Sequence, residues 1–99
     1  MVIVIGSIVG TDETIDELIR LSLEHVRRSR TEPGCLSHAV SRDVENDLRL
    51  VFVERWADRD ALDAHFAVPA SGAFVDQATT MAAEPPTIEI DEVVDRRRD

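Results

Sequence analysis

The chain has 99 residues, 43% of them hydrophobic, and a formal net charge of −9. This length predicts one domain spanning residues 1–99, and the apolar share is enough to form its core, which excludes intrinsic disorder. The acidic balance argues against nucleic-acid binding, because nucleic-acid-binding proteins present a basic face. We expect the basic run Arg96–Arg98 to be a frayed, solvated tail.

The single cysteine, Cys35, has no partner for an intrachain disulfide and no neighbour at metal-ligand spacing. We expect it to be a small packing residue. The opening residues Met1–Ile5 lack a basic leader, and no apolar run approaches the length of a membrane span. We therefore expect a cytoplasmic protein without membrane contacts or structural metal.

Val2–Val9 are apolar on both alternating faces, which predicts a central strand covered on each side. Gly6 interrupts this strand. A glycine inside a strand indicates either a bulge or the close approach of a ligand or another backbone, and we favour the bulge.

The next element is a helix that starts at a capping box, Thr14–Glu17. Acidic residues at its start and arginines at its end match the two poles of the helix dipole. His25 lies beside the apolar stripe, and we expect it at the boundary of the core. The stripe consists of Ile15, Leu18, Ile19, Ser22 and Val26.

Pro33 and Gly34 end this helix, and the second strand covers Cys35–Asp43. Alternation places Leu36, His38, Val40 and Arg42 on one face of that strand. The turn-rich loop of residues 44–47 predicts a hairpin with the third strand, Leu48–Trp56.

A strand-to-helix corner follows Trp56. Asp58 can accept the free N–H groups of the helix 60–66, whose inner face carries Leu62, His65 and Phe66, and Pro69 stops it. A further helix over residues 71–83 ends before Pro85 and Pro86, and residues 87–94 form the last strand. The further helix carries Phe74, Ala78 and Met81 at helical spacing.

The order βαββαβ predicts an α+β, ferredoxin-like fold with an antiparallel sheet. Right-handed crossovers place the first and third strands side by side at its centre, with the helices on one face. Both of these strands are apolar on their second face as well. We expect a second copy to cover that face, giving a homodimer in which two sheets close into an α+β barrel.

Several residues at the corner could carry chemistry. Trp56 shares a strand face with Phe52 and Glu54, and its indole could pack in the core or stack on a planar ligand. His65 is either a hydrogen-bonded structural histidine or a general base. Glu54 is an acceptor for a substrate hydroxyl or half of a surface ion pair, and His38 contacts a ligand or faces solvent.

The corner also carries a resemblance. Glu54-Arg55-Trp56, Leu62-Asp63-Ala64-His65, Val68-Pro69 and Phe74, with Glu32-Pro33-Gly34-Cys35-Leu36 upstream, resemble the antibiotic biosynthesis monooxygenase family. The resemblance implies the same dimeric barrel and a tryptophan lining the cavity between sheet and helices. The family includes quinol and polyketide oxygenases and haem-degrading relatives. It often has tyrosine in place of His38 and a second histidine where Ala70 stands.

The resemblance implies a cofactor-independent monooxygenase that uses molecular oxygen on a small quinol or polycyclic phenol. Trp56 and His65 would be catalytic, and the substrate would contact five further residues: His38, Phe52, Glu54, Phe66 and Phe74. The sequence has no phosphate-binding loop, dinucleotide fingerprint or zinc spacing, so we expect no cofactor and no metal. The alternative is a non-catalytic dimeric binding module for a small aromatic metabolite, and the third candidate is a haem-degrading relative.

Overall fold

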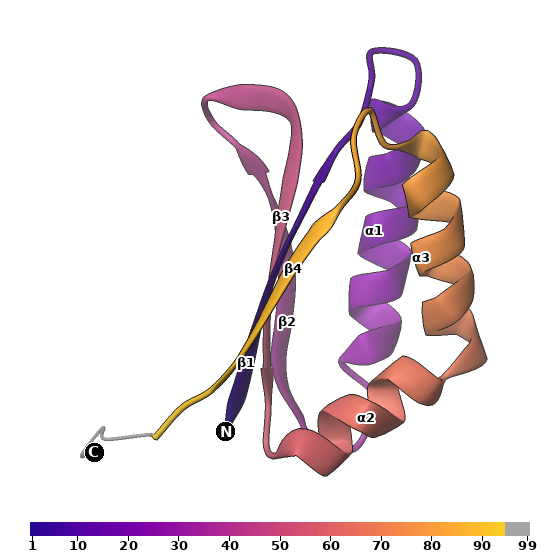
Figure 1. The fold of residues 1–99 in the computed structure, drawn as a ribbon. Coiled ribbons are helices and arrows are strands. Elements are labelled where there is room, and N and C mark those ends of the chain that lie inside the picture. The colour runs from indigo at the N-terminus through magenta and orange to yellow at the C-terminus, as the bar shows by residue number, and fades with distance from the viewer. Residues whose placement is uncertain (95–99) are drawn as a thin grey trace.

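An antiparallel sheet of four strands carries three helices on one of its faces (Figure 1). This architecture is that of a computed structural model, which describes residues 1–94. The α+β, ferredoxin-like order predicted from the sequence is confirmed. The elements are β1 (Val2–Val9), α1 (Ile15–Ser29), β2 (Cys35–Asp43), β3 (Asn46–Trp56), α2 (Arg59–Ala67), α3 (Pro69–Met81) and β4 (Thr87–Glu92).

The strand order is β2-β3-β1-β4, so β1 and β3 lie side by side at the centre, as predicted. Their register runs without a shift from Val2 opposite Trp56 to Val9 opposite Arg49. Gly6 pairs in regular register with both neighbouring strands. The bulge predicted at Gly6 is therefore wrong.

A bulge does occur in β2, between Cys35 and Ser37. It turns the Leu36 side chain outward, where 58% of the residue is exposed. Cys35 instead packs against the core beside Trp56, while His38 is buried. The prediction that Leu36 and His38 share a face is wrong, because one extra residue in a strand reverses the alternation.

The core between the sheet and the helices has two apolar clusters. One contains Ile8 and Phe52, and the other contains Val4 and Trp56. Along β3, Glu54 is the inward-facing residue between Phe52 and Trp56. The side chains buried at this level are polar, so a polar layer separates the two apolar clusters. We call it the polar layer and define it as His25, His38, Glu54 and His65.

Helix α1 begins at Ile15 as predicted, but the capping box does not form. The Thr14 hydroxyl donates to the carbonyl of Met81 at 2.8 Å and so ties the start of α1 to the end of α3. Glu17 pairs with Arg20 one turn later. The predicted placement of acidic and basic residues at the two ends of α1 is confirmed.

The corner after β3 forms as expected, because Asp58 Oδ1 accepts from the Ala61 N–H at 2.8 Å and caps α2. Pro69 follows the end of α2 and also starts the next helix. It occupies the first turn of α3, where its fixed φ suits a helix start, so α3 begins two residues before the predicted Ser71. No helix within residues 1–94 is both long and apolar enough to cross a membrane.

Other boundaries differ by two residues. β3 begins at Asn46 instead of Leu48, because the hairpin turn is tighter than expected, and β4 ends at Glu92 instead of Val94. The predicted tail Arg96–Arg98 lies outside the described residues.

The face of the sheet opposite the helices has no covering element among the described residues (Figure 1). Ile5 and Val53 pair on this outer face, and Ile5 is 41% exposed. Burying apolar side chains of the two central strands away from water would lower the free energy of the assembly. The second copy predicted from the sequence remains our proposal for covering this face.

Val53→Asp should therefore shift the chain from dimer to monomer and lower its stability, because a charge buried in an interface without a partner is costly. Sedimentation at micromolar concentration measures the shift. The matched control is Val44→Asp, the same substitution at a turn residue that is 97% exposed. A wild-type chain that sediments as a soluble monomer would rule out the barrel.

Candidate active site

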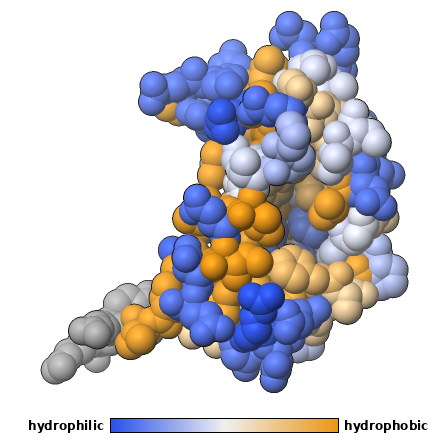
Figure 2. Space-filling model, viewed as in Figure 1, coloured by the Kyte–Doolittle hydropathy of each residue, from blue (hydrophilic) through white to orange (hydrophobic). Residues whose placement is uncertain are grey.

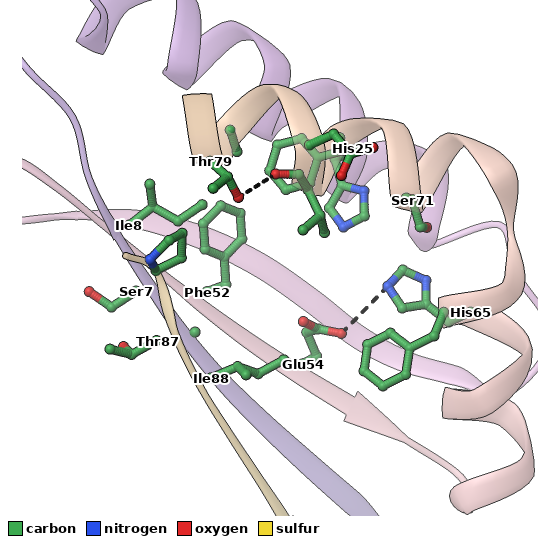
Figure 3. A pocket seen from close by; sticks show the side chains of 18 residues that line it. Ser7, Ile8, His25, Phe52, Glu54, His65, Ser71, Thr79, Thr87 and Ile88 are labelled. Carbon is green, nitrogen blue, oxygen red and sulfur yellow. Dashed lines mark hydrogen bonds and ion pairs between the residues drawn. The ribbon is translucent and has the colours of Figure 1, made fainter. Parts of the chain in front are cut away.

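A cavity of about 500 Å³ lies between the sheet and α3, at the edge formed by β4. Figure 2 shows apolar residues around the hollow on this side of the molecule. Ile88 and Val75 line its rim and are more than half exposed. Deeper in the cavity the lining becomes aromatic and then polar, with Glu54 and His65 at its inner end (Figure 3).

Gly6 keeps the floor of the cavity open. It is the inward-facing position of β1 between the buried residues Val4 and Ile8, and it lines the cavity. A Cβ there would lie 3.6 Å from the Thr87 carbonyl oxygen and 3.7 Å from the Phe52 Cβ. Any larger side chain would project into the cavity. Glycine at this position therefore leaves space in the cavity, and the close approach of a ligand here, the less favoured alternative, stays a prediction.

His65 enters the cavity wall from α2 and is 3% exposed. Its Nδ1 lies 2.8 Å from Glu32 Oε1. Because a carboxylate only accepts, this contact places the proton on Nδ1 and leaves a lone pair on Nε2. Nε2 in turn lies 3.9 Å from Glu54 Oε1 (Figure 3). This is the geometry of a general base whose second nitrogen is held by a carboxylate.

No local pattern in the sequence marks Glu32 as a site residue. It precedes Pro33 in the turn after α1, far from His65 along the chain, and only the packing of that turn against α2 brings the two together. The Glu32-Pro33-Gly34 stretch was notable only as part of the resemblance. Gly34 in this turn has φ +81°, and a Cβ there would lie 2.5 Å from the Ala61 Cβ. Glycine thus permits the close contact between the turn and α2.

Glu54 is buried, and its Oε1 collects the polar contacts of the layer. It accepts from Trp56 Nε1 at 2.9 Å and lies 3.1 Å from His38 Nε2. Burial alone would raise the pKa of Glu54, but the contacts with His38 and Trp56 outweigh it, so the pKa is lowered. Glu54 is therefore an internal carboxylate, and the surface ion pair considered from the sequence is wrong.

His25 was expected at the core boundary, but it is only 6% exposed. Its ring stacks on Phe74 with centroids 4.2 Å apart, and its Nδ1 lies 2.6 Å from Arg28 Nη2. Burial, and then the proximity of His38, His65 and Arg28, which would repel a proton on the ring, lower the pKa of His25 to about 3. Its spacing of one turn from Ser22 already placed it on the buried stripe of α1, which was the available signal.

Two predicted ligand contacts lie behind the cavity wall. Trp56 is fully buried against Val2 and Leu62 and does not line the cavity. His38 is 1% exposed and likewise does not line the cavity, although it contacts Glu54, which does. The structure therefore contradicts a stacking wall formed by Trp56, whose ring instead supports His65 at a centroid distance of 4.6 Å.

The other predicted contacts do line the cavity. Phe52 and Phe74 form its inner aromatic wall, Phe66 lies nearer the mouth, and Glu54 and His65 supply polar atoms. Their roles in binding or catalysis stay predictions.

Together the fold and the cavity define a ferredoxin-like α+β protein with an aromatic pocket that ends in a buried carboxylate–histidine pair. The chain belongs to the antibiotic biosynthesis monooxygenase family, whose model matches residues 1–77. The predicted family membership is confirmed.

The chain is also similar to individual proteins. An uncharacterised protein of Synechocystis sp. is 36% identical over 89 residues, and the chain spans 60% of that protein's length. A crystal structure of an antibiotic biosynthesis monooxygenase is 30% identical, with a TM-score of 0.88 over 96% of this chain and 100% of the other. A Mycobacterium tuberculosis protein shares the fold at 24% identity and a TM-score of 0.89, over 98% of each chain.

The position of Trp56 leads to a paired mutational prediction. Trp56→Phe should lower the free energy of unfolding by about 1–3 kcal/mol, because it loses packing and the bond to Glu54. Its affinity for a polycyclic phenol such as naphthol should stay near that of the wild type. Phe66→Ala, at a cavity residue that is 43% exposed, should do the reverse. Calorimetric titration and urea unfolding of both variants check this. A large loss of affinity in Trp56→Phe but not in Phe66→Ala would show that the indole contacts the ligand.

His25 predicts a pH dependence of stability. Its pKa is about 3 in the fold and 6.5 in the unfolded chain, so only the unfolded chain takes up a proton between these values. The free energy of unfolding should therefore fall as pH decreases from 6.5 toward 3. Urea unfolding over this range should give a shallower pH slope for His25→Gln than for the wild type. A loss of stability in His25→Gln that is equal at every pH, with the wild-type slope unchanged, would contradict the assignment.

Proposed function

We propose that this protein is a monooxygenase that transfers oxygen from O₂ to a small quinol or polycyclic phenol without an organic cofactor. The observation that carries the proposal is His65 at the inner end of an aromatic cavity, with Nδ1 held by Glu32 at 2.8 Å and Nε2 free to accept a proton. Family membership and the relatives described as monooxygenases support the reaction type.

The cavity suits a flat, mainly apolar ligand. Its volume of about 500 Å³ lies within the range of small-molecule sites, and phenylalanine rings form its walls. Aromatic rings prefer offset or edge contacts with one another, which the arrangement of Phe52 and Phe74 leaves room for. Ser71 Oγ is buried in the lining, has no hydrogen-bond partner among residues 1–94, and could bind a ligand oxygen.

Deprotonation of the phenol is the step that the polar layer can assist. A substrate hydroxyl near His65 Nε2 would donate its proton to that nitrogen. The resulting imidazolium would lie between the carboxylates of Glu32, 2.8 Å from Nδ1, and Glu54, 3.9 Å from Nε2. Two negative neighbours in a largely apolar site stabilise the positive charge that forms during proton transfer.

Removal of the proton makes the ring electron-rich enough to reduce O₂. The phenolate passes one electron to O₂, and the resulting radicals combine to form a carbon–oxygen bond at a ring carbon that carries hydrogen. Breaking the O–O bond leaves one oxygen atom on the ring as a carbonyl. The other oxygen leaves as water with the ring hydrogen and the former phenolic hydrogen. A phenol plus O₂ thus gives a quinone plus H₂O, with the substrate supplying all the electrons.

The alternative function is a non-catalytic binding module for a small aromatic metabolite. The observation that favours it is Ala70, exposed at the start of α3 where members of this family often carry a second histidine. If that histidine is required for turnover, the cavity would bind the phenol without oxidising it.

Oxygen uptake with a hydroquinone or naphthol substrate tests the proposal directly. Metal- and flavin-stripped protein should exceed the protein-free rate, and uptake should stop under anaerobic conditions. His65→Gln should lower the rate by about 10²–10⁴-fold, the usual contribution of a general base. Glu32→Gln should lower it less, because the base remains but its orientation is lost.

The matched control for Glu32→Gln is Glu24→Gln, which removes the same charge from an exposed pair with Arg20. Its rate should equal the wild-type rate. If phenols bind but uptake never exceeds the autoxidation rate, the binding module is the better account. If phenols do not bind, both functions are excluded.

A further inference from the structure

All three histidines of the chain meet in the polar layer. His25 comes from α1, His38 from β2 and His65 from α2, and one ring nitrogen of each lies within 4.8 Å of those of the other two. All three are buried. The sequence predicted no metal because these residues do not follow any ligand spacing. Only the fold brings them together.

His38 supplies an independent observation. It is 1% exposed, and its Nδ1 makes no hydrogen bond within the described residues. Its Nε2 pairs with Glu54 Oε1 at 3.1 Å. Buried polar groups almost always have partners, so a buried imidazole nitrogen without one points to a ligand that could occupy it.

The surroundings match the needs of a cation. Glu54 lies near two of the histidines, at 3.1 Å from His38 and 3.9 Å from His65, and could be a fourth ligand. Glu32 holds the outer nitrogen of His65, as carboxylates do behind metal-bound histidines. His25 and His65 also line the cavity, which leaves one side of the cluster open to an exchangeable ligand.

We propose that His25, His38 and His65, with Glu54, form a binding site for a divalent transition-metal ion of the zinc, cobalt or nickel type. Imidazole nitrogens with one carboxylate suit these ions rather than magnesium or calcium, which prefer oxygen ligands. Zn–N bonds of about 2.0–2.1 Å require the nitrogens to close from their present spacing, which side-chain rotations can provide.

Arg28 opposes metal binding in the present arrangement. Its guanidinium lies 2.6 Å from His25 Nδ1 and can only donate, so the proton of the neutral ring lies on Nε2. For Nε2 to bind a metal, the proton must move to Nδ1 and Arg28 must turn away. Arg28 is only half-buried and can turn into solvent. Arg28→Gln should therefore tighten binding, since it removes a cation and offers an amide oxygen to Nδ1–H.

A bound metal would also compete with the proposed base, because it would occupy the Nε2 lone pair of His65. The metal site itself does not depend on the proposed reaction. Zn²⁺ should therefore inhibit any oxygen uptake by the metal-free protein.

The test is titration of tag-free, chelator-treated protein with Zn²⁺ by calorimetry and with Co²⁺ by visible absorption. We expect about one ion per chain and intense d–d bands from a site of low coordination number. His38→Gln should weaken binding by more than the ~10–100-fold typical of an outer-shell change. Cys35→Ser, which removes the only thiol, should bind like the wild type. Arg28→Gln should bind about 10-fold tighter, a gain that misfolding cannot produce.

Equal affinities of wild type and His38→Gln, with both shown to be folded by circular dichroism, would overturn the metal site whatever the activity. Loss of binding in Cys35→Ser would do the same. If the ion binds as expected and only the loaded protein takes up oxygen, the metal site stands and the cofactor-free reaction is wrong.

Discussion

The carboxylate of Glu54 is the constraint on which the rest of the site depends. A buried charge is costly, and here one oxygen atom accepts from Trp56 Nε1 and pairs with His38 Nε2. That requirement explains why the core is divided by a polar layer and why the only tryptophan is fully buried. It also places a negative charge where an imidazolium of His65 would form. The stability of the fold and the chemistry proposed for the cavity thus use the same contacts.

The sequence was sufficient for the fold because the decisive signals were local. Alternation and length defined β1 and β3, and Asp58 marked the start of α2. The bulge in β2 and the cavity role of Gly6 could not be read locally. Each depends on which residues of the neighbouring strand or helix lie opposite. The same alternation pattern is therefore compatible with more than one arrangement.

Only part of the candidate site could be predicted from the sequence, again because some of its contacts are local and others are not. Phe52 and His65 were placed correctly because strand and helix periodicity fix which way they point. Glu32 and His25 were missed, since their importance arises from contacts between elements far apart in the sequence. Trp56 was predicted in the cavity wall, but it lies in the core directly behind that wall. Periodicity showed that it faces inward, but it could not separate the wall of a cavity from the core behind that wall.

The central claim is that His65 presents a lone pair at Nε2 because Glu32 holds the proton on Nδ1. Nitrogen-15 NMR of the histidine rings tests it most directly, with His65→Gln used for assignment. In free protein at mildly alkaline pH, His65 should be the neutral Nδ1–H tautomer. Saturation with a phenol that cannot be oxidised should convert it to a ring protonated at both nitrogens or hydrogen-bonded at Nε2. A free His65 in the Nε2–H tautomer, or a ring unchanged by a bound phenol, would contradict the account.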